Sequence, residues 1–173
     1  ALVELGAHVI GVARSAEALE ELSSELNSGR EGGLSTEVID LTKLSELSAW
    51  AEGLEGRYGP LSGVIHNAGV DDFQPSEAMS AGAIEAQVAL NLTAPLLINR
   101  ALLPPMLARD EGVLLHLSSV AGYFPTPFGA VYSGTKAGLW LYSEALAIEH
   151  AHTNLAFVTL HPSFVNGVGM HER

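Results

Sequence analysis

The sequence contains no cysteine and few basic residues, and both absences limit what the protein can do. It has 8 Lys and Arg residues against 20 Asp and Glu, which gives a formal net charge of −12. Without cysteine the chain has neither a disulfide framework nor a thiolate metal site. The excess of negative charge argues against nucleic acid or an anionic membrane as a partner.

Long apolar runs are also missing. No stretch approaches the ~20 consecutive apolar residues of a membrane span, and no signal peptide is visible. We therefore expect a cytoplasmic protein. The chain is 47% hydrophobic and 16% charged, a composition that supports a hydrophobic core and is unlike that of a disordered chain. At 173 residues we expect one domain or part of one.

Short apolar runs and helical stripes alternate along the chain. Apolar runs bounded by turn residues predict buried strands at 8–13, 36–39, 61–66, 113–117 and 155–160. Apolar residues at helical spacing predict helices at 16–26, 43–57, 80–109 and 129–151, the third interrupted at Pro95 and at Pro104-Pro105. Ala1 to Leu5 indicate the tail of a helix closed by Gly6. This alternation predicts an α/β fold, a doubly wound parallel sheet with helices on both faces.

The most informative residues lie near the start of the last predicted helix. Tyr132 and Lys136 are four residues apart and therefore share one face of that helix. A Y-x-x-x-K pair alone is common by chance. Three further motifs accompany it: Ser118-Ser119 at a strand end, Asn67-Ala68-Gly69 after another strand, and Asn91 within a long helix. In this combination and order, over nearly the whole chain, the motifs resemble the short-chain dehydrogenase/reductase family.

The resemblance implies a Rossmann-like fold and an oxidoreductase that acts on a carbonyl or secondary alcohol. Carbonyl reduction needs a hydride at carbon and a proton at oxygen. By resemblance, Tyr132 is the general acid for reduction and the general base for oxidation. A phenol has a reference pKa near ~10, and the ammonium group of Lys136 is placed to lower it by roughly one to three units. The alternative is an amphipathic helix with a surface Tyr and Lys.

Two further residues match the family's catalytic pattern. Ser119, thirteen residues before Tyr132, matches the serine that hydrogen-bonds the substrate oxygen, and we assign Ser118 a structural role. Asn91 precedes Pro95 by four residues, so its main-chain carbonyl lacks the usual helical donor and is predicted to be free. In the family this carbonyl binds a water that extends the proton relay toward the lysine. The alternative is a proline kink with a solvated asparagine.

The resemblance also assigns cofactor contacts. Tyr132 and Lys136 would face the nicotinamide ribose, and the small residues Asn67, Ala68 and Gly69 would let the backbone lie close to the cofactor. His66 stands where the family usually has another asparagine. Asp40 and Leu41 match the acidic position beside the adenine ring, although Asp40 could instead cap the next helix. Pro162 and Val165 match the segment that contacts the nicotinamide carboxamide, from which Ser163 and Gly167 depart.

The end of the strand at 8–13 bears on the choice of cofactor. NAD enzymes usually place an acid there to bind the ribose 2′-hydroxyl, whereas an arginine accommodates a 2′-phosphate. The acid's position holds Ala13, and Arg14 follows. The sequence therefore favours NADP(H), with NAD still possible.

The family's T-G-x-x-x-G-x-G segment, which contains the phosphate-binding glycine turn, does not occur in the chain. We therefore expect residues 1–173 to be a single partial dinucleotide-binding and catalytic domain, without its first strand, from a longer protein. A second hypothesis is a truncated, non-catalytic binding or interaction module on the same scaffold. A third is the same fold catalysing dehydration or epimerisation with a bound nucleotide.

Three expectations concern metals, substrate and assembly. His66, His116 and His161 fall near strand ends, but no cysteine or carboxylate accompanies them at ligand spacing, so we expect no metal. Bulky apolar residues between Ser119 and Tyr132 favour an apolar substrate: Tyr123, Phe124, Pro125, Pro127 and Phe128. The helices of Asn91 and Tyr132 carry long apolar surfaces, and the family's dimer interface lies there, so we expect a homodimer or homotetramer.

Overall fold

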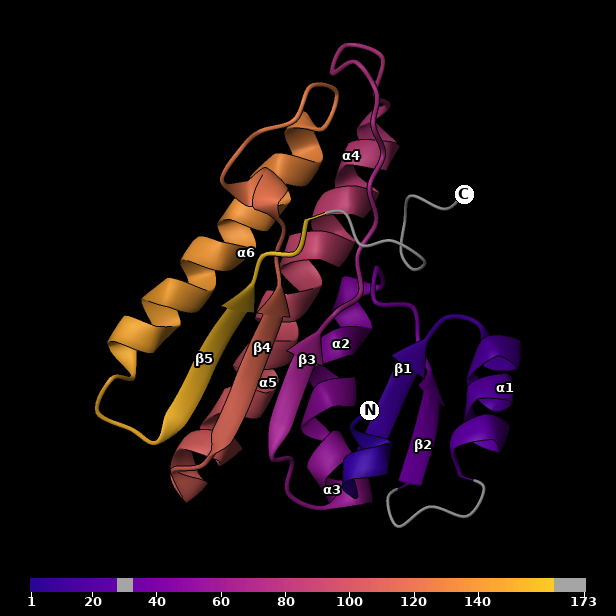
Figure 1. Ribbon diagram of the computed structural model, residues 1–173, viewed down its shortest axis with the longest axis vertical. Coiled ribbons are helices and arrows are strands. Elements are labelled where there is room, and N and C mark those ends of the chain that lie inside the picture. Colours follow the sequence, from indigo (N-terminus) through magenta and orange to yellow (C-terminus); the bar gives the residue numbers. More distant parts are fainter. Residues whose placement is uncertain (28–32, 164–173) are drawn as a thin grey trace. The chain divides into compact units, whose positions relative to one another are not determined.

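The computed structural model describes residues 1–27 and 33–163, which form two compact units divided between Lys43 and Leu44 (Figure 1). The first unit contains a 3-10 turn η1 (Val3–Leu5), strand β1 (His8–Ala13), helix α1 (Ala16–Leu26) and strand β2 (Gly33–Val38). β1 and β2 pair in parallel, and α1 packs on both. Gly6 ends η1 with a φ of 86°, as its position predicts.

Local hydrogen bonds set the boundaries of this unit. Ser15 begins α1 because its hydroxyl accepts from the N–H of Ala18 at 3.2 Å. β2 starts earlier than predicted because the side chain of Asn27 satisfies the backbone of Leu34. The N–H of Leu34 donates to Asn27 Oδ1 at 2.7 Å, and Asn27 Nδ2 donates to the carbonyl of Leu34 at 3.0 Å.

The second unit is larger. Its elements are α2 (Leu44–Glu52), α3 (Leu54–Tyr58), β3 (Gly63–His66), α4 (Ala81–Val88), the π turn η2 (Ala89–Thr93), α5 (Ala94–Arg109), β4 (Gly112–Leu117), the 3-10 turn η3 (Val120–Gly122), α6 (Ala130–Glu149) and β5 (Leu155–Leu160). Strands β3, β4 and β5 form a parallel sheet in that order. Their carboxyl ends therefore meet at one edge, where ligands of open α/β sheets bind.

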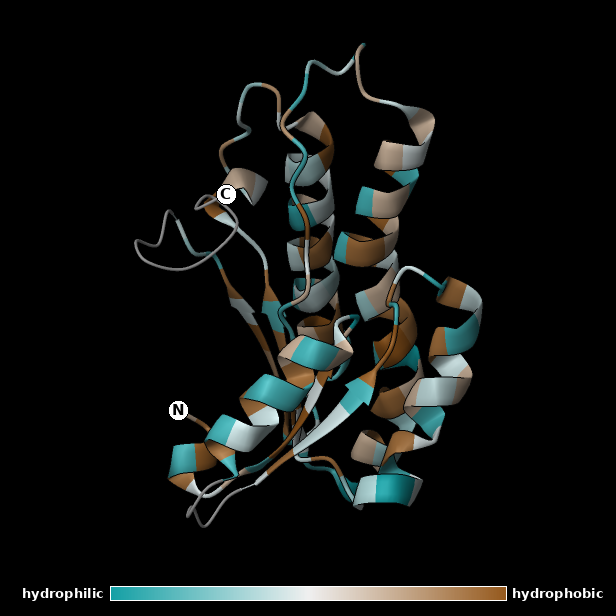
Figure 2. Ribbon diagram, turned by 90° about the vertical axis from the view of Figure 1, so that its right-hand side faces the viewer, coloured by the Kyte–Doolittle hydropathy of each residue, from teal (hydrophilic) through white to brown (hydrophobic). Residues whose placement is uncertain are grey.

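The core of this unit lies between the sheet and α5. Met106 and Leu114 are fully buried and pack with Leu155. Burying a side chain of this size stabilises the fold by about 1.5–3 kcal/mol. In Figure 2 the helices carry both brown and teal segments, as expected where one helix face contacts the core and the other contacts solvent.

The long helical segment is not interrupted at its prolines. It runs continuously from Ala81 to Arg109 and widens at the π turn, where the N–H of Ala94 donates to the carbonyl of Ala89. Pro95, whose nitrogen carries no hydrogen, directly follows the π turn, in the first turn of α5. Pro104 and Pro105 lie inside α5. The helix tolerates them because the fixed φ of proline is helical and because packing of the buried neighbouring residues offsets the lost hydrogen bonds. The predicted interruption at Pro104-Pro105 was therefore wrong, whereas the α-helix does change to a π turn directly before Pro95.

The continuous helix also bears on the expectation that the chain has no membrane span. The helix from Ala81 to Arg109 has 29 residues and a window of mean hydropathy 1.3, so by length and composition it could cross a bilayer. The helix is thus a candidate span by mean hydropathy, although Glu85, Gln87, Asn91 and Asn99 interrupt its apolar residues. The helix nevertheless buries the polar side chains of Asn91 and Asn99 completely, and α5 packs on α2 and β4. In the structure 28% of the window is buried, and buried asparagine side chains with hydrogen-bond partners indicate a helix that packs within the protein.

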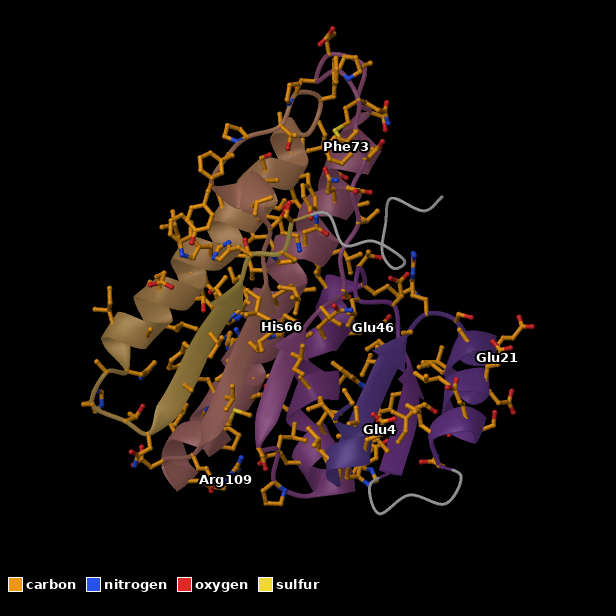
Figure 3. The ribbon with its side chains drawn as sticks, viewed as in Figure 1. Glu4, Glu21, Glu46, His66, Phe73 and Arg109 are labelled. Carbon is orange, nitrogen blue, oxygen red and sulfur yellow. The ribbon has the colours of Figure 1, made fainter. Side chains whose placement is uncertain are left out.

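Two histidines lie beneath the strand ends. The rings of His66 on β3 (Figure 3) and His116 on β4 are stacked with centroids 5.0 Å apart. Asn99 of α5 bridges them: its Oδ1 is 2.6 Å from His66 Nε2, and its Nδ2 is 2.9 Å from His116 Nε2. His116 Nδ1 is 3.1 Å from the hydroxyl of Ser143 on α6. The network joins two strands and two helices at one point.

The amide of Asn99 determines which ring nitrogens carry hydrogen. An amide oxygen only accepts, so His66 Nε2 donates to it; an amide nitrogen only donates, so His116 Nε2 accepts. Both rings are neutral in this arrangement. Burial lowers the pKa of His66 to about 4. Burial, together with the nearby His66, lowers the pKa of His116 to about 3.

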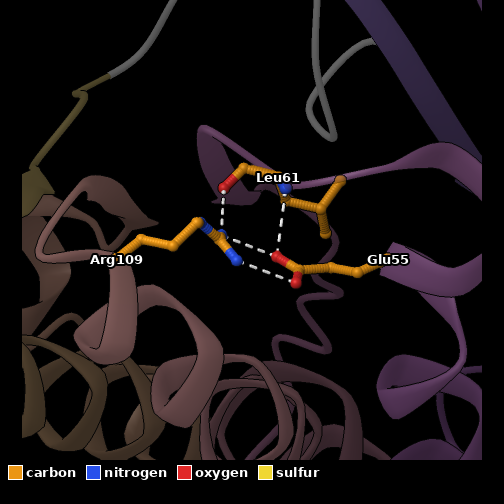
Figure 4. Close-up of polar contacts among 3 residues, drawn as sticks. All are labelled: Glu55, Leu61 and Arg109. Atoms are coloured by element: carbon orange, nitrogen blue, oxygen red, sulfur yellow. Dashed lines mark hydrogen bonds and ion pairs between the residues drawn. The ribbon is translucent and has the colours of Figure 1, made fainter.

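The other boundary differences lie at the opposite end of the sheet. The helix predicted at 43–57 is divided at Gly53 into α2 and α3. β3 begins later than predicted because Leu61 bonds outside the sheet: its N–H donates to Glu55 Oε1 at 3.1 Å, and its carbonyl accepts from Arg109 at 3.1 Å (Figure 4). The guanidinium of Arg109 also holds Glu55 with bonds of 2.7 and 2.9 Å.

The end of β4 packs closely on α6 through η3. A Cβ added to Gly122 would lie 3.1 Å from both Ala137 N and the carbonyl carbon of Lys136, which are backbone atoms that cannot move aside. Ser118 secures the same contact, because its hydroxyl donates to the carbonyl of Lys136 at 2.8 Å. Only glycine fits at 122 without displacing η3.

We expect Gly122→Ala to lower the free energy of unfolding by about 1–3 kcal/mol, the usual cost of overpacking. Gly134→Ala is the control: Gly134 is in α6 with nothing within 4 Å of an added Cβ. That change should raise stability by about 0.5–1 kcal/mol, since alanine favours a helix. Urea unfolding measures both; equal effects of the two substitutions would contradict the close packing of η3 on α6.

The histidine network predicts loss of stability in acid. The folded pKa values of about 4 and about 3 lie below the ordinary 6.5, so the unfolded chain binds more protons between pH 6.5 and about 3. The network's contribution is complete above pH 6.5 and declines as pH falls through this window. Urea midpoints at pH 7 and 5 should differ less in a double His66→Asn, His116→Asn variant than in the wild type. The same pH dependence in both proteins would contradict this account.

Candidate active site

Ser119 and Tyr132 meet at the carboxyl edge of the second unit's sheet. Tyr132 projects from α6 and is 7% exposed, while Ser119 directly follows β4 and is 9% exposed. Ser119 lies close enough to the phenol of Tyr132 to act on its pKa. Its Oγ accepts from the N–H of Ala121 at 3.1 Å, which fixes the hydroxyl at the start of η3. The structure thus brings the predicted serine and tyrosine together.

Lys136 lies beneath this pair. Its Nζ is 5.7 Å from the centroid of the Tyr132 ring and donates to the carbonyl of Leu117 at 2.7 Å. The side chain is 3% exposed, and burial lowers the pKa of its ammonium group to about 8. A buried lysine with one fixed acceptor and a lowered pKa is suited to binding a polar ligand or passing a proton.

The phenol of Tyr132 does not have the lowered pKa that the Tyr-Lys spacing predicts. Burial raises the pKa of Tyr132, the hydroxyl of Ser119 opposes the rise, and the charge of Asp71 adds to it. That prediction was wrong because Lys136 lies over the ring face and donates to Leu117, whereas desolvation acts on the phenol itself. The phenol is protonated at neutral pH, as a general acid requires.

Asn91 is fully buried in the π turn, so the solvated-asparagine alternative is excluded. Its Oδ1 accepts from the N–H of Val70 at 2.8 Å, and its Nδ2 donates to the carbonyl of Val70 at 2.8 Å and to Thr135 Oγ1 at 3.2 Å. Thr135 in turn donates to the carbonyl of Tyr132 at 2.8 Å. One amide thus ties the loop after β3 to the helix of Tyr132. The free main-chain carbonyl of Asn91 stays a prediction.

The loop after β3 contributes Asn67, Ala68 and Gly69. Asn67 and Ala68 are exposed, so their backbone is open to a ligand. A Cβ on Gly69 would lie 3.3 Å from Asn91 Oδ1 and 3.4 Å from Lys136 Nζ. The backbone therefore passes directly over the two polar side chains; its close approach to a cofactor stays a prediction.

The residues predicted to bind the adenine side lie in the first unit. Arg14 follows β1, and Asp40 and Leu41 follow β2; because the strands are parallel, all three lie at one edge. Asp40 Oδ1 accepts from the hydroxyl of Thr42 at 2.7 Å and from its N–H at 3.0 Å. These bonds, and then the charge of Arg14, lower the pKa of Asp40. This turn supports a local structural role for Asp40, and its adenine contact stays a prediction.

At the end of β5, the carbonyl of Pro162 accepts from the N–H of Val120 at 3.1 Å, which joins β5 to η3. Val165 lies outside the described residues. His161 is 3.0 Å from the hydroxyl of Tyr123 through Nε2, and its Nδ1 is 3.4 Å from the carbonyl of Ser119. In the described part of the chain, no three or more His, Cys, Asp or Glu side chains are placed to hold a metal.

Sequence reasoning missed several residues of this region. Phe73 packs against Tyr132 with ring centroids 6.0 Å apart (Figure 3). Gln87 is buried and donates to the carbonyl of Val70 at 3.2 Å, in support of Asn91. Asn99 carried a usable signal, because asparagine is a poor helix former and is rarely placed mid-helix without a partner. Nothing in the sequence pattern distinguished Phe73 from other loop aromatics.

Comparisons with known proteins agree with this geometry. The family model for short chain dehydrogenases matches residues 1–173. The chain is 30% identical over 171 residues to the ketoacyl reductase HetN of Nostoc, covering 98% of this chain and 59% of HetN. It is 32% identical over 169 residues to an uncharacterised oxidoreductase of Listeria monocytogenes, covering 95% of this chain and 67% of that protein. The chain thus spans roughly three fifths to two thirds of these relatives.

Solved structures show the same fold. A metagenomic short-chain oxidoreductase in complex with NADP is 32% identical with a TM-score of 0.87, and the match covers 94% of this chain and 74% of that one. Serine dehydrogenase of Escherichia coli is 26% identical with a TM-score of 0.84, covering 96% and 75%. These matches confirm the Rossmann-like, doubly wound parallel architecture. By its motifs, its fold and the family model that spans it, the chain belongs to the short-chain dehydrogenase family.

Proposed function

We propose that the protein is an oxidoreductase that transfers a hydride between NADP(H) and a carbonyl or secondary alcohol, with Tyr132 as general acid and base. One observation carries the proposal: a buried, protonated phenol lies beside Ser119, with the ammonium group of Lys136 against its ring, at the carboxyl edge of a parallel sheet. If Tyr132 and Lys136 had only a structural role in the helix, their burial together beside Ser119 would have no explanation.

The side chains support the following assignment of roles in the reaction. When bound, the reduced nicotinamide supplies a hydride to the substrate carbon. Tyr132 gives its phenolic proton to the substrate oxygen, and the hydroxyl of Ser119 donates a hydrogen bond to the same oxygen. Lys136, with a pKa of about 8, is largely cationic at pH 7, so its ammonium group can donate to the nicotinamide ribose of the bound cofactor. In oxidation the same proton returns to the phenolate.

Asn91 and Gly69 position this machinery. The amide of Asn91 joins the loop of Val70 to Thr135, one residue before Lys136. Gly69 lets the loop backbone lie against Lys136 Nζ. Both contacts fit a cofactor laid across this loop, beside the ammonium group. We propose that Pro162 and Val165 contribute to the nicotinamide side of the same site.

NADP is the proposed cofactor, with NAD as the alternative. In the first unit Ala13 holds the position where an acid would reject a 2′-phosphate, and Arg14 follows it; a guanidinium binds phosphate oxygens in a bidentate manner. The 32%-identical metagenomic relative was solved with NADP. We further propose a small, apolar carbonyl or alcohol substrate, a cytoplasmic location and a homodimer or homotetramer.

A non-catalytic binding module is the second candidate. The convergence of Ser119, Tyr132 and Lys136 favours catalysis, since a binding module has no use for a protonated phenol beside a buried ammonium group.

Tyr132→Phe should reduce kcat for ketone reduction by about 100-fold or more, the range for loss of a general acid, while the Kd for NADPH stays unchanged. Tyr142→Phe is the matched control, because Tyr142 lies on the same helix and burial raises its pKa in the same way. That variant should retain turnover. Wild-type activity in Tyr132→Phe would remove Tyr132 from the proposed role.

Arg14→Met should weaken NADPH binding by about 10-fold or more, as expected for loss of a charge-assisted phosphate contact. The Kd for NADH should change little, because NADH has no 2′-phosphate. Fluorescence titration of both cofactors gives the comparison. Tighter binding of NADH than of NADPH by the wild type would contradict the NADP assignment.

A further inference from the structure

Two buried histidines of the second unit take no part in the proposed reaction. His66 is the last residue of β3 (Figure 3), and the register of the sheet pairs it with His116 of β4. Their rings stack with centroids 5.0 Å apart, and the amide of Asn99 bridges the two Nε2 atoms. Since the family usually has an asparagine in place of His66, this bridged pair is a feature of the chain itself.

The bridging amide admits one arrangement of hydrogens. Its oxygen can only accept and its nitrogen can only donate, so one of the two facing Nε2 atoms carries a hydrogen and the other does not. A hydrogen on both Nε2 atoms, or on neither, would leave a buried polar atom without a partner, which costs free energy. His66, Asn99 and His116 therefore hold each other in one geometry, which fixes the end of β3 to the end of β4 and to α5.

The backbone that follows each histidine leads to the ammonium group of Lys136. One residue after His116, the carbonyl of Leu117 accepts from Lys136 Nζ at 2.7 Å. Three residues after His66, the backbone passes so close to the same nitrogen that a Cβ on Gly69 would lie 3.4 Å from it. Two backbone segments thus enclose the ammonium group, and each of them starts at one of the bridged histidines.

Ser143 connects the bridge to the helix that carries Lys136. His116 Nδ1 is 3.1 Å from the hydroxyl of Ser143, whose side chain is buried. Ser143 and Lys136 are seven residues apart in α6, about two helical turns, and therefore share the buried face of that helix. The ring of Tyr142 covers His116 edge-on at a centroid distance of 6.0 Å. The bridge thus contacts the helix from which the side chain of Lys136 projects.

We propose that Asn99 is a positioning residue for Lys136: through His66 and His116, its amide fixes the two backbone segments that hold the ammonium group toward the bound cofactor. This rests on the proposed function, because Lys136 is the residue assigned to the nicotinamide ribose. The sheet alone does not require the bridge, since apolar side chains at this level would avoid the burial of three polar ones. The bridge adds one fixed geometry, because hydrogen bonds are directional and apolar contacts are not.

The test combines NMR of the histidine rings, NMR titration of Lys136 and fluorescence titration of NADPH. In the wild type, the ring nitrogen signals should show a hydrogen on Nε2 of His66 and none on Nε2 of His116. Asn99→Leu has no bridging amide, so the two segments should separate and admit water to the ammonium group. The pKa of Lys136 should then rise from about 8 toward the ordinary 10.5, and NADPH should bind about 10-fold more weakly.

Asn99→Asp should rebuild the bridge with a different arrangement of hydrogens. A carboxylate accepts from both sides, so Nε2 of His116 should gain a hydrogen while the Kd for NADPH stays within about 2-fold of the wild type. Asn154→Ala is the control, because Asn154 bonds Asp110 at the amino ends of β4 and β5. That variant should leave the histidine signals, the pKa of Lys136 and the Kd unchanged.

Hydrogen on both Nε2 atoms of the wild type, or on neither, would overturn the bridge without the need for any variant. An unchanged pKa of Lys136 in Asn99→Leu would overturn the positioning role whatever the cofactor affinity. Equal weakening of NADPH binding in Asn99→Leu and Asn99→Asp would also overturn it, because the loss would not depend on the bridge. A raised pKa of Lys136 in Asn99→Leu, where the wild type binds no NADPH, would support the positioning role and count against the proposed function.

Discussion

The contact between the end of β4 and Lys136 of α6 is the constraint on which the site depends. Lys136 donates through Nζ to Leu117, and its own carbonyl accepts from the hydroxyl of Ser118. Gly122 then packs against the same stretch of helix backbone. The end of β4 and helix α6 are thus joined by two hydrogen bonds, one to the side chain of Lys136 and one to its main-chain carbonyl. Ser119 follows this joined strand end, and Tyr132 precedes Lys136 by one helical turn, so their meeting is a consequence of the contact.

Two asparagine amides extend this arrangement into the rest of the second unit. Asn91 joins the loop after β3 to Thr135, and Asn99 joins the two stacked histidines. Each amide is fully buried, where an unpaired polar group would cost free energy and a paired one fixes a unique arrangement. The same burial that makes these bonds specific keeps both histidines neutral and the phenol of Tyr132 protonated. Burial at the sheet edge therefore has two effects: it makes the hydrogen bonds of the two amides specific, and it sets the protonation of the histidines and of Tyr132.

Much of this could be predicted from the sequence, because local patterns encode it. The helix at Ala16–Leu26 and the strands at His8–Ala13 and Leu155–Leu160 have the predicted bounds. Apolar runs, an N-cap serine and a left-handed glycine specify these elements without help from distant residues. The pairing of Ser119 with Tyr132 followed from their motif and from the common edge of parallel strands.

Other features depend on tertiary contacts that no local pattern contains. The start of β3 is set by Glu55 and Arg109, which belong to two different helices. Helix α5 continues through Pro104 and Pro105 because packing offsets two missing hydrogen bonds. The raised pKa of Tyr132 reflects burial, whereas the spacing to Lys136 suggested the opposite sign. Phe73 reaches Tyr132 through the fold of a loop whose sequence has no distinguishing motif.

The central claim is that a hydride passes to a substrate carbon beside Tyr132. The most direct measurement is to incubate the protein with a ketone and NADPH carrying deuterium at the transferable position, and to analyse the alcohol by mass spectrometry. The account predicts one deuterium on the carbinol carbon. Alcohol formed without deuterium at that carbon, or no alcohol from any of a panel of apolar ketones while NADPH is bound, would contradict it.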